Sequence, residues 1–137
     1  MLAKKYFDEI HRILHKAYET QAETIRKCSE LIVETVMRHN ALYAFGCNHA
    51  GLLSQELFYR TGGLVTINPI LVPGLALDAR PITLTTGMER LEGFGKTIVE
   101  NSYLKKGDLL IVHSVSGRNN VVVDVALYAR EAGATVI

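Results

Sequence analysis

The chain has 137 residues, of which 48% are hydrophobic, with 15 lysines and arginines against 14 aspartates and glutamates. That length suffices for one domain with a buried core, but not for two ordinary domains. A net charge of +1 gives no electrostatic reason to expect nucleic acid or an anionic membrane as a partner. The two cysteines, Cys28 and Cys47, are too few for a disulfide framework and are typical of a reducing compartment.

The sequence gives no indication of export or of membrane insertion. Acidic residues occur within the first ten residues of the chain, in the segment where a signal peptide requires an apolar run. No apolar run approaches the roughly 18 residues of a membrane span. We therefore expect a cytoplasmic protein. The apolar run 134–137 after Gly133 is typical of the start of a buried strand, so we expect a chain cut short at its C-terminus. A short edge strand at a natural end is the alternative.

Residues 2–39 contain neither glycine nor proline, and their apolar residues recur at helical spacing. An unbroken helix of this length would extend about 55 Å, more than the width of a small domain. Either the helix breaks near residues 19–24, where the apolar stripe thins, or it stays continuous and packs against a partner chain. Both versions favour a homo-oligomer formed through the N-terminal helical region, and two helices packed on the core of a monomer are the alternative.

From residue 40 onward, short apolar strands alternate with helices. Strands are predicted at residues 41–45, 64–67 (with an extension to 71 as the alternative), 109–112 and from 134 onward, and helices at 50–60, 88–102 and 119–132. Continuous apolar strands of this kind are typical of sheets covered on both faces. Their alternation with helices predicts right-handed crossovers and a parallel sheet. We expect one domain, in which an N-terminal helical region (1–39) precedes an α/β core (40–137).

The third predicted strand leads into its helix through the segment His-Ser-Val-Ser-Gly-Arg-Asn-Asn. Ligands of open parallel sheets bind at the carboxyl ends of the strands, and free N–H groups at a helix start attract anions. Ser114 and Ser116 add hydroxyl donors, and Gly117 allows the backbone to approach a phosphate closely. Asn119 and Asn120 are candidates for capping the helix or for binding sugar hydroxyls. Capping alone explains one of these residues and not the cluster, so we predict a ligand site.

The first predicted strand ends in a second loop, Gly46-Cys-Asn-His-Ala-Gly51. This loop has the first and last glycines of the dinucleotide fingerprint, but Asn48 stands where the middle glycine would admit a pyrophosphate. The second strand ends on Asn68 rather than on an acidic residue for the ribose, so we expect no nicotinamide. One cysteine and one histidine in this loop are too few ligands for a metal. We therefore expect neither a metal nor another cofactor.

Together, the two loops resemble those of the phosphosugar-isomerase (SIS) domain family. That family carries Gly-x-Gly-x-Ser after its first core strand and Ser-x-Ser-Gly after a later one. The second motif is intact at residues 114–117, whereas Asn48 and Ala50 replace a glycine and a serine of the first. The segment Gln-Glu-Leu-Phe-Tyr-Arg at residues 55–60 is similar to the helix that follows the first loop in phosphoheptose isomerases and their bacterial relatives. The resemblance covers residues 42–137.

This resemblance implies a three-layer α/β/α, flavodoxin-like fold with a five-stranded parallel sheet, assembled as a dimer or tetramer, and a sugar phosphate as ligand. Isomerases of the family interconvert aldose and ketose phosphates, a reaction that needs a carboxylate base and a proton donor. The Glu-Leu-x-x-Arg context implies Glu56 as the base, although a surface ion pair with Arg60 is the alternative. The resemblance implies a histidine partner from the C-terminal part that we expect to be missing. His49 and His113, each beside a loop at a strand end, are local substitutes, with His49 preferred.

For binding, we assign Gly46, Asn48 and the polar residues of the later loop to the substrate. An exposed ion pair is the simplest interpretation of Glu89 and Arg90, and the alternative places both residues at the sugar, with Arg90 on the ligand phosphate. The sequence thus favours phosphosugar binding, with aldose–ketose isomerisation as the candidate reaction. A non-catalytic sugar-phosphate sensor is the alternative, because losing a glycine and a hydroxyl from the first loop harms catalysis more than binding.

Overall fold

The computed structural model describes all residues, 1–137. Their contacts divide the chain into two compact units, Met1–Glu34 and Thr35–Ile137. Helix α1 (Leu2–Met37) is continuous, which selects the unbroken alternative for the N-terminal region. It accounts for the first unit, which contains no other element. No helix in the chain is both long enough and apolar enough to cross a membrane.

The second unit is built on a four-stranded parallel sheet in the order β2-β1-β3-β4. The strands are β1 (Leu42–Gly46), β2 (Ile67–Pro69), β3 (Leu109–His113) and β4 (Thr135–Val136). Strands β1 and β3 pair along their full length, so that Gly46 lies opposite His113. The two loops expected to bind ligand therefore leave the sheet side by side. This strand order is the flavodoxin-like one, whose ligands bind where the order reverses, between β1 and β3.

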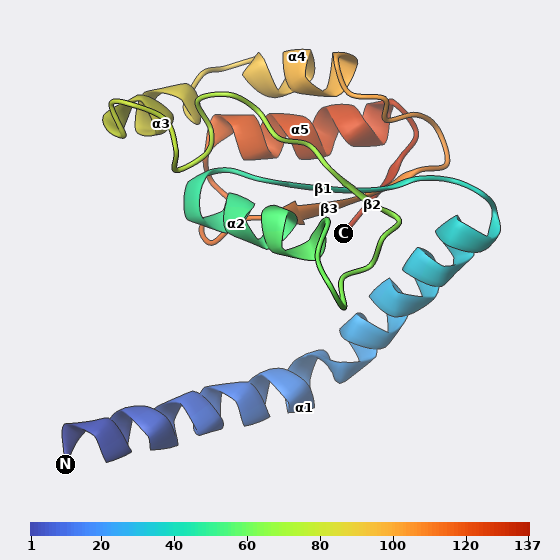
Figure 1. Cartoon of the computed structure of the whole chain (residues 1–137). Helices are drawn as coiled ribbons and strands as arrows, with labels where there is room; N and C mark the ends of the chain where they lie inside the picture. The colour runs from blue at the N-terminus through green and yellow to red at the C-terminus, as the bar shows by residue number, and fades with distance from the viewer. The chain divides into compact units, whose positions relative to one another are not determined.

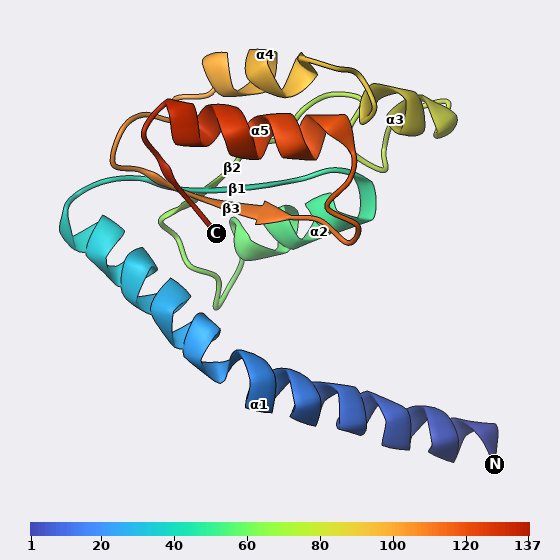
Figure 2. The same cartoon turned by 180° about the vertical axis from the view of Figure 1, so that it is seen from behind.

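Helices cover both faces of the sheet. They are α2 (Asn48–Leu57), α3 (Thr83–Met88), α4 (Phe94–Glu100) and α5 (Asn120–Glu131). Helix α2 lies on one face and α4 and α5 lie on the other, while the short α3 lies near the end of the sheet at which β1 stops (Figure 1, Figure 2). The predicted three-layer α/β/α architecture is confirmed.

Three predicted elements were wrong in their extent. The helix expected over residues 50–60 is α2, which ends at Leu57 because Phe58 is extended, with φ −105° and ψ 142°. The second strand was expected to start at residue 64 and to end at residue 67 or 71, but residues 64–66 are exposed and β2 starts at Ile67. It ends on Pro69, which an edge strand tolerates. The helix expected over residues 88–102 is interrupted. Gly93 has a φ of 75° and precedes α4 as its cap residue, in a left-handed conformation that a helix interior does not admit.

The main core lies between the sheet and helices α4 and α5. Phe45 and Leu110 from the strands and Val121 and Val125 from α5 are all fully buried there. Leu42 and its neighbour on β3 are also fully buried, and since side chains alternate along a strand, they face the other layer. The central strands are therefore apolar on both faces, as their continuous hydrophobic runs predicted.

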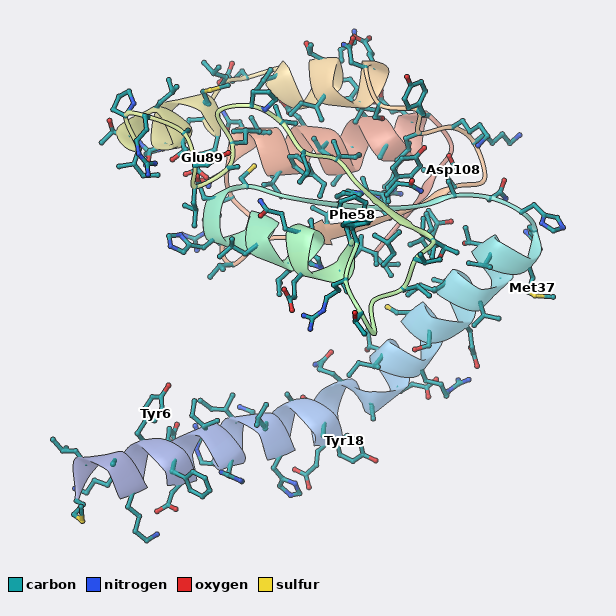
Figure 3. The ribbon with its side chains drawn as sticks, in the orientation of Figure 1. Tyr6, Tyr18, Met37, Phe58, Glu89 and Asp108 are labelled. Atoms are coloured by element: carbon teal, nitrogen blue, oxygen red, sulfur yellow. The ribbon has the colours of Figure 1, made fainter.

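A buried carboxylate holds the amino ends of the two central strands. Asp108 is 0% exposed, and it accepts hydrogen bonds from the backbone N–H groups of Ala41 and Lys105, each at 2.9 Å. The Lys105 ammonium lies 3.3 Å from the same carboxylate. Asp108 and Glu89 lie at opposite ends of the sheet (Figure 3). One end is thus closed by internal hydrogen bonds, and the other remains available for a ligand.

Helices α4 and α5 approach each other too closely for any side chain at Gly95. A Cβ there would lie 2.3 Å from the Asp124 Cβ and 2.6 Å from the Val125 nitrogen. Because the second of these atoms belongs to the backbone, a bulkier residue would have to separate the two helices.

We expect Gly95→Ala to lower the free energy of unfolding by about 1–3 kcal/mol, since overpacking outweighs the better helix propensity of alanine. Urea unfolding followed by circular dichroism measures this change. Gly87→Ala in α3 is the matched control: a Cβ there meets nothing within 4 Å, so stability should hold or rise by up to about 1 kcal/mol. Equal stability of the two variants would show that the close helix contact is not required.

Candidate functional site

The turn from β1 into α2 brings two glycines into contact. A Cβ on Gly46 would lie 2.8 Å from the backbone of Ala50, and a Cβ on Gly51 would lie 2.7 Å from the Gly46 oxygen. Within this turn, Asn48 has a φ of 53°, in the left-handed region that asparagine tolerates better than most residues. Its N–H donates to the Leu75 oxygen at 2.8 Å. Asn48 therefore keeps a glycine-like backbone while adding a side chain.

The loop from β3 into α5 is organised by its own hydroxyl groups. The Gly117 N–H donates to the Ser114 hydroxyl at 2.9 Å, and the Arg118 N–H donates to the Ser116 hydroxyl at 3.4 Å. Asn119 occupies the N-cap position but makes no side-chain capping hydrogen bond. Both serine hydroxyls accept within the loop, so their hydrogens remain free to donate to a ligand.

A cavity of about 430 Å³ lies at the carboxyl ends of β1 and β3. Its walls come from the β1–α2 turn, the β3–α5 loop and helix α3 with the residues around it. Five of the predicted site residues line it together: Asn48, His49, Ser114, Ser116 and Asn119. Residues more than 60 positions apart in the sequence are thus gathered at one edge of the sheet.

Glu56 is not among the residues that line this cavity. It lies on α2 with a side chain that is 66% exposed, and its carboxylate pairs with Arg60 one helical turn away. This is the geometry of the surface ion pair that the spacing allowed. The structure therefore does not bring Glu56 to the other site residues.

The remaining predicted residues surround the cavity without lining it. Gly46 and Gly117 shape the two loops, through the close contact at the first and a φ of 63° at the second. The side-chain amide of Asn120 donates to the backbone oxygen of Arg90 at 2.9 Å. Arg90 itself is exposed, and its neighbour Glu89 pairs with Asn48 instead.

Helix α3 supplies a wall whose threonines the sequence analysis did not identify; for Glu89, that analysis had only an alternative at the sugar. Thr83, Thr86 and Glu89 line the cavity, and their spacing of three places them on one face of a helical segment. Glu89 is half-buried, and its carboxylate accepts a hydrogen bond from the Asn48 side-chain nitrogen at 2.7 Å. It is the one carboxylate that lines the cavity. The Thr-x-x-Thr-x-x-Glu spacing is the signal that could have identified this wall.

Burial acts on two titratable groups of the cavity, His113 and Cys47. Burial lowers the pKa of His113 below its ordinary value, and its Nδ1 lies 3.4 Å from the hydroxyl of the buried Ser54. Burial and then the charge of Glu89 raise the pKa of Cys47 to about 12, so this thiol is not a nucleophile. No lysine or arginine lines the cavity, and no cluster of three or more potential ligands could hold a metal ion.

The chain resembles several known proteins. UPF0309 proteins from Shouchella clausii and Oceanobacillus iheyensis are each 42% identical over 134 residues, covering 98% of this chain and 54% of the relative. The chain therefore spans about half the length of these curated relatives. A solved structure of phosphoheptose isomerase from Neisseria gonorrhoeae aligns with a TM-score of 0.73, at 22% identity, over 99% of this chain and 73% of that one. At such low identity, this likeness supports the fold alone.

A match to a protein family completes the comparison. The SIS domain family matches residues 5–137, which include nearly all of both units and every element that builds the cavity. It agrees with the two loop motifs, the strand order and the position of the cavity. The chain belongs to the SIS domain family.

Proposed function

We propose that the chain binds a sugar phosphate in the cavity at the carboxyl ends of β1 and β3. The observation that carries this proposal is that one cavity collects two kinds of hydrogen-bonding group. The loop of residues 114–119 supplies donors, and Glu89 supplies a carboxylate that the Asn48 side chain holds by a hydrogen bond. A phosphomonoester and a polyol need these two kinds of surface.

The phosphate fits the loop that precedes α5. Helix α5 has 12 residues, so the dipole and the free N–H groups of its first turn create a region of positive potential. The hydroxyls of Ser114 and Ser116 lie beside that helix start. A Cβ added at Gly117 would meet nothing within 4 Å, so the backbone there is open to an approaching anion. Because the cavity has no cationic side chain, the phosphate would be held by neutral donors.

The sugar fits the wall that Glu89 and helix α3 provide. The Glu89 carboxylate accepts hydrogen bonds from hydroxyl groups, and Thr83 and Thr86 on the same face add hydroxyls of their own. The Oδ1 atom of Asn48 is buried without a partner, and a buried acceptor left unpaired is unfavourable. A donor group on the ligand would relieve that cost.

We propose Glu89 as the base if the bound sugar phosphate is isomerised. Moving a proton between adjacent carbons requires a carboxylate at the reacting atoms, and Glu89 is the carboxylate that lines the cavity. The imidazole of His113 or of His49 would exchange a proton with the sugar oxygen, since both side chains also line the cavity. Glu56 stays the base implied by the family resemblance, without support from its position.

A non-catalytic sensor is the second candidate, and one observation favours it. Ala50 lines the cavity at the position where the family motif carries a serine. The hydroxyl that would contact the ligand there is absent, while the donors of the later loop are intact. Such a site retains binding more readily than catalysis.

We also propose a homo-oligomer formed through α1. In the unit Met1–Glu34, which is a single helix, the stripe residues Phe7, Ile13 and Leu14 are 60%, 47% and 62% exposed; the neighbouring Tyr6 and Tyr18 are labelled in Figure 3. One helix cannot bury an apolar stripe within its own unit.

Sedimentation velocity should therefore give a mass above the 15.2 kDa of one chain. The Leu14→Lys variant should have a lower mass than the wild type, because it places a charge in the apolar stripe. A single wild-type species of monomer mass would contradict the proposal.

Binding is tested by thermal shift of the full chain against a panel of sugar phosphates, the matching unphosphorylated sugars and inorganic phosphate. A true ligand at a hundredfold excess over its dissociation constant stabilises the fold by about 2.7 kcal/mol. Ser116→Ala should weaken this binding, because it removes a donor to the phosphate. Ser29→Ala on the exposed part of α1 is the matched control and should bind as wild type. The proposal fails if no phosphorylated sugar stabilises the chain, or if the two variants bind equally.

Catalysis is tested by comparing Glu89→Gln with Glu56→Gln, two identical changes at different sites. With the sugar phosphate that binds, we expect Glu89→Gln to lower the aldose–ketose exchange rate by about 10²–10⁴-fold and Glu56→Gln to leave it unchanged, as followed by proton NMR. The reverse result would make Glu56 the base. Binding without exchange in the wild type would instead favour the sensor.

A further inference from the structure

Helix α5 holds the backbone at Glu89 and in the residues that follow it. The Val121 N–H donates to the Glu89 oxygen at 3.2 Å, and the Asn120 side-chain amide donates to the Arg90 oxygen at 2.9 Å. One turn further along α5, the carboxylate of Asp124 accepts the N–H of Gly93 at 2.8 Å. Three hydrogen bonds from one helix therefore hold the short segment that carries the cavity's carboxylate.

We infer that Asn120 is a positioning residue that sets the place of Glu89 in the cavity and does not contact the ligand. This inference rests on the proposed function, because it assumes that Glu89 faces the sugar. Asn120 does not line the cavity, and its side-chain nitrogen donates to the backbone oxygen of Arg90, the residue that follows Glu89. The sequence had suggested a substrate-binding role for this residue.

The arrangement couples the two walls of the site. Residues 114–119, which face the phosphate in our proposal, run directly into Asn120 and Val121, which hold the segment of Glu89. The Val121 N–H belongs to the first turn of α5, whose N–H groups have no partner within the helix. In our proposal, the loop before α5 binds the phosphate. The first two residues of α5, Asn120 and Val121, hold the segment that carries Glu89. Because these residues are adjacent in the chain, they would fix the distance between the bound phosphate and the Glu89 carboxylate.

Asn48 holds the carboxylate from the other side. Its Nδ2 donates to the Glu89 Oε2 at 2.7 Å, and its backbone N–H donates to the Leu75 oxygen at 2.8 Å. However, Asn48 also lines the cavity, so a variant there would change positioning and ligand contact together. Asn120 is the cleaner test.

The first measurement needs no ligand. In nitrogen–proton correlation spectra, the chemical shift of the Asn48 side-chain amide reports its hydrogen bond to Glu89. The Glu89→Gln variant gives the chemical shift of this amide when it has no carboxylate partner. We expect Asn120→Ala to move this signal toward that position. Asn101→Ala is the matched control, because the Asn101 amide makes a similar bond to a backbone oxygen, that of Thr97, at 2.8 Å. An Asn48 signal that ignores Asn120→Ala, or responds equally to the control, overturns the inference.

The second measurement compares two ligands. For the sugar phosphate that stabilises the wild type most, Asn120→Ala should weaken binding by about three- to tenfold, the effect of losing one hydrogen bond's alignment. Binding of inorganic phosphate should stay within about twofold, and the variant should add no loss to Glu89→Gln. Equal weakening of both ligands, or additive losses, would mean that Asn120 acts on the phosphate or on the fold.

The two failures are distinguishable. If no sugar phosphate binds the wild type but the Asn48 signal responds to Asn120→Ala, the proposed function fails and the positioning of Glu89 holds. Should the alanine variant not fold, Asn120→Asp repeats the first measurement, since it is isosteric, suits a helix start and carries no donor. If Asn120→Asp leaves the Asn48 signal at its wild-type position, the inference is wrong.

Discussion

The contact between Gly46 and the first turn of α2 is the constraint on which the site depends. With a Cβ at Gly46 placed 2.8 Å from the backbone of Ala50, neither this position nor Gly51 tolerates a side chain, so α2 begins directly where β1 ends. This places Asn48 at the edge of the sheet in a left-handed conformation. From there it reaches the segment that begins at Leu75 through its N–H, and Glu89 through its side chain.

The two ends of the sheet have different physical characters. At the amino ends, the fully buried Asp108 has each carboxylate oxygen paired with a backbone N–H, an arrangement that fixes the strands and leaves nothing for a ligand. At the carboxyl ends, the donors of residues 114–119 and the Asn48 Oδ1 atom are not all paired within the chain. Incomplete pairing is unfavourable for folding alone, and it is what a binding site requires. In our proposal, the amino ends of the strands therefore serve stability and the carboxyl ends serve ligand binding.

Much of this could be predicted, because the relevant signals are local. Apolar runs bounded by glycines predicted β1, β3 and both loops, and the rule for parallel sheets brought the loops together. Helix α3 could not be predicted in the same way, because it has six residues, three of them threonines and one glycine, which are weak helix formers. The role of Glu89 depends on a hydrogen bond to a residue 41 positions away. Glu56 shows the converse: a motif in the right sequence context, on an exposed face of α2.

The central claim is that one cavity holds a phosphate on the loop before α5 and a sugar against the wall of Glu89. A nitrogen–proton NMR titration of the full chain tests it most directly, using inorganic phosphate and the sugar phosphate that stabilises the chain. We expect both ligands to shift the backbone amides of residues 116–119, and the sugar phosphate alone to shift the side-chain amide of Asn48. Shifts centred on another surface, or an Asn48 amide that responds equally to both ligands, would contradict it.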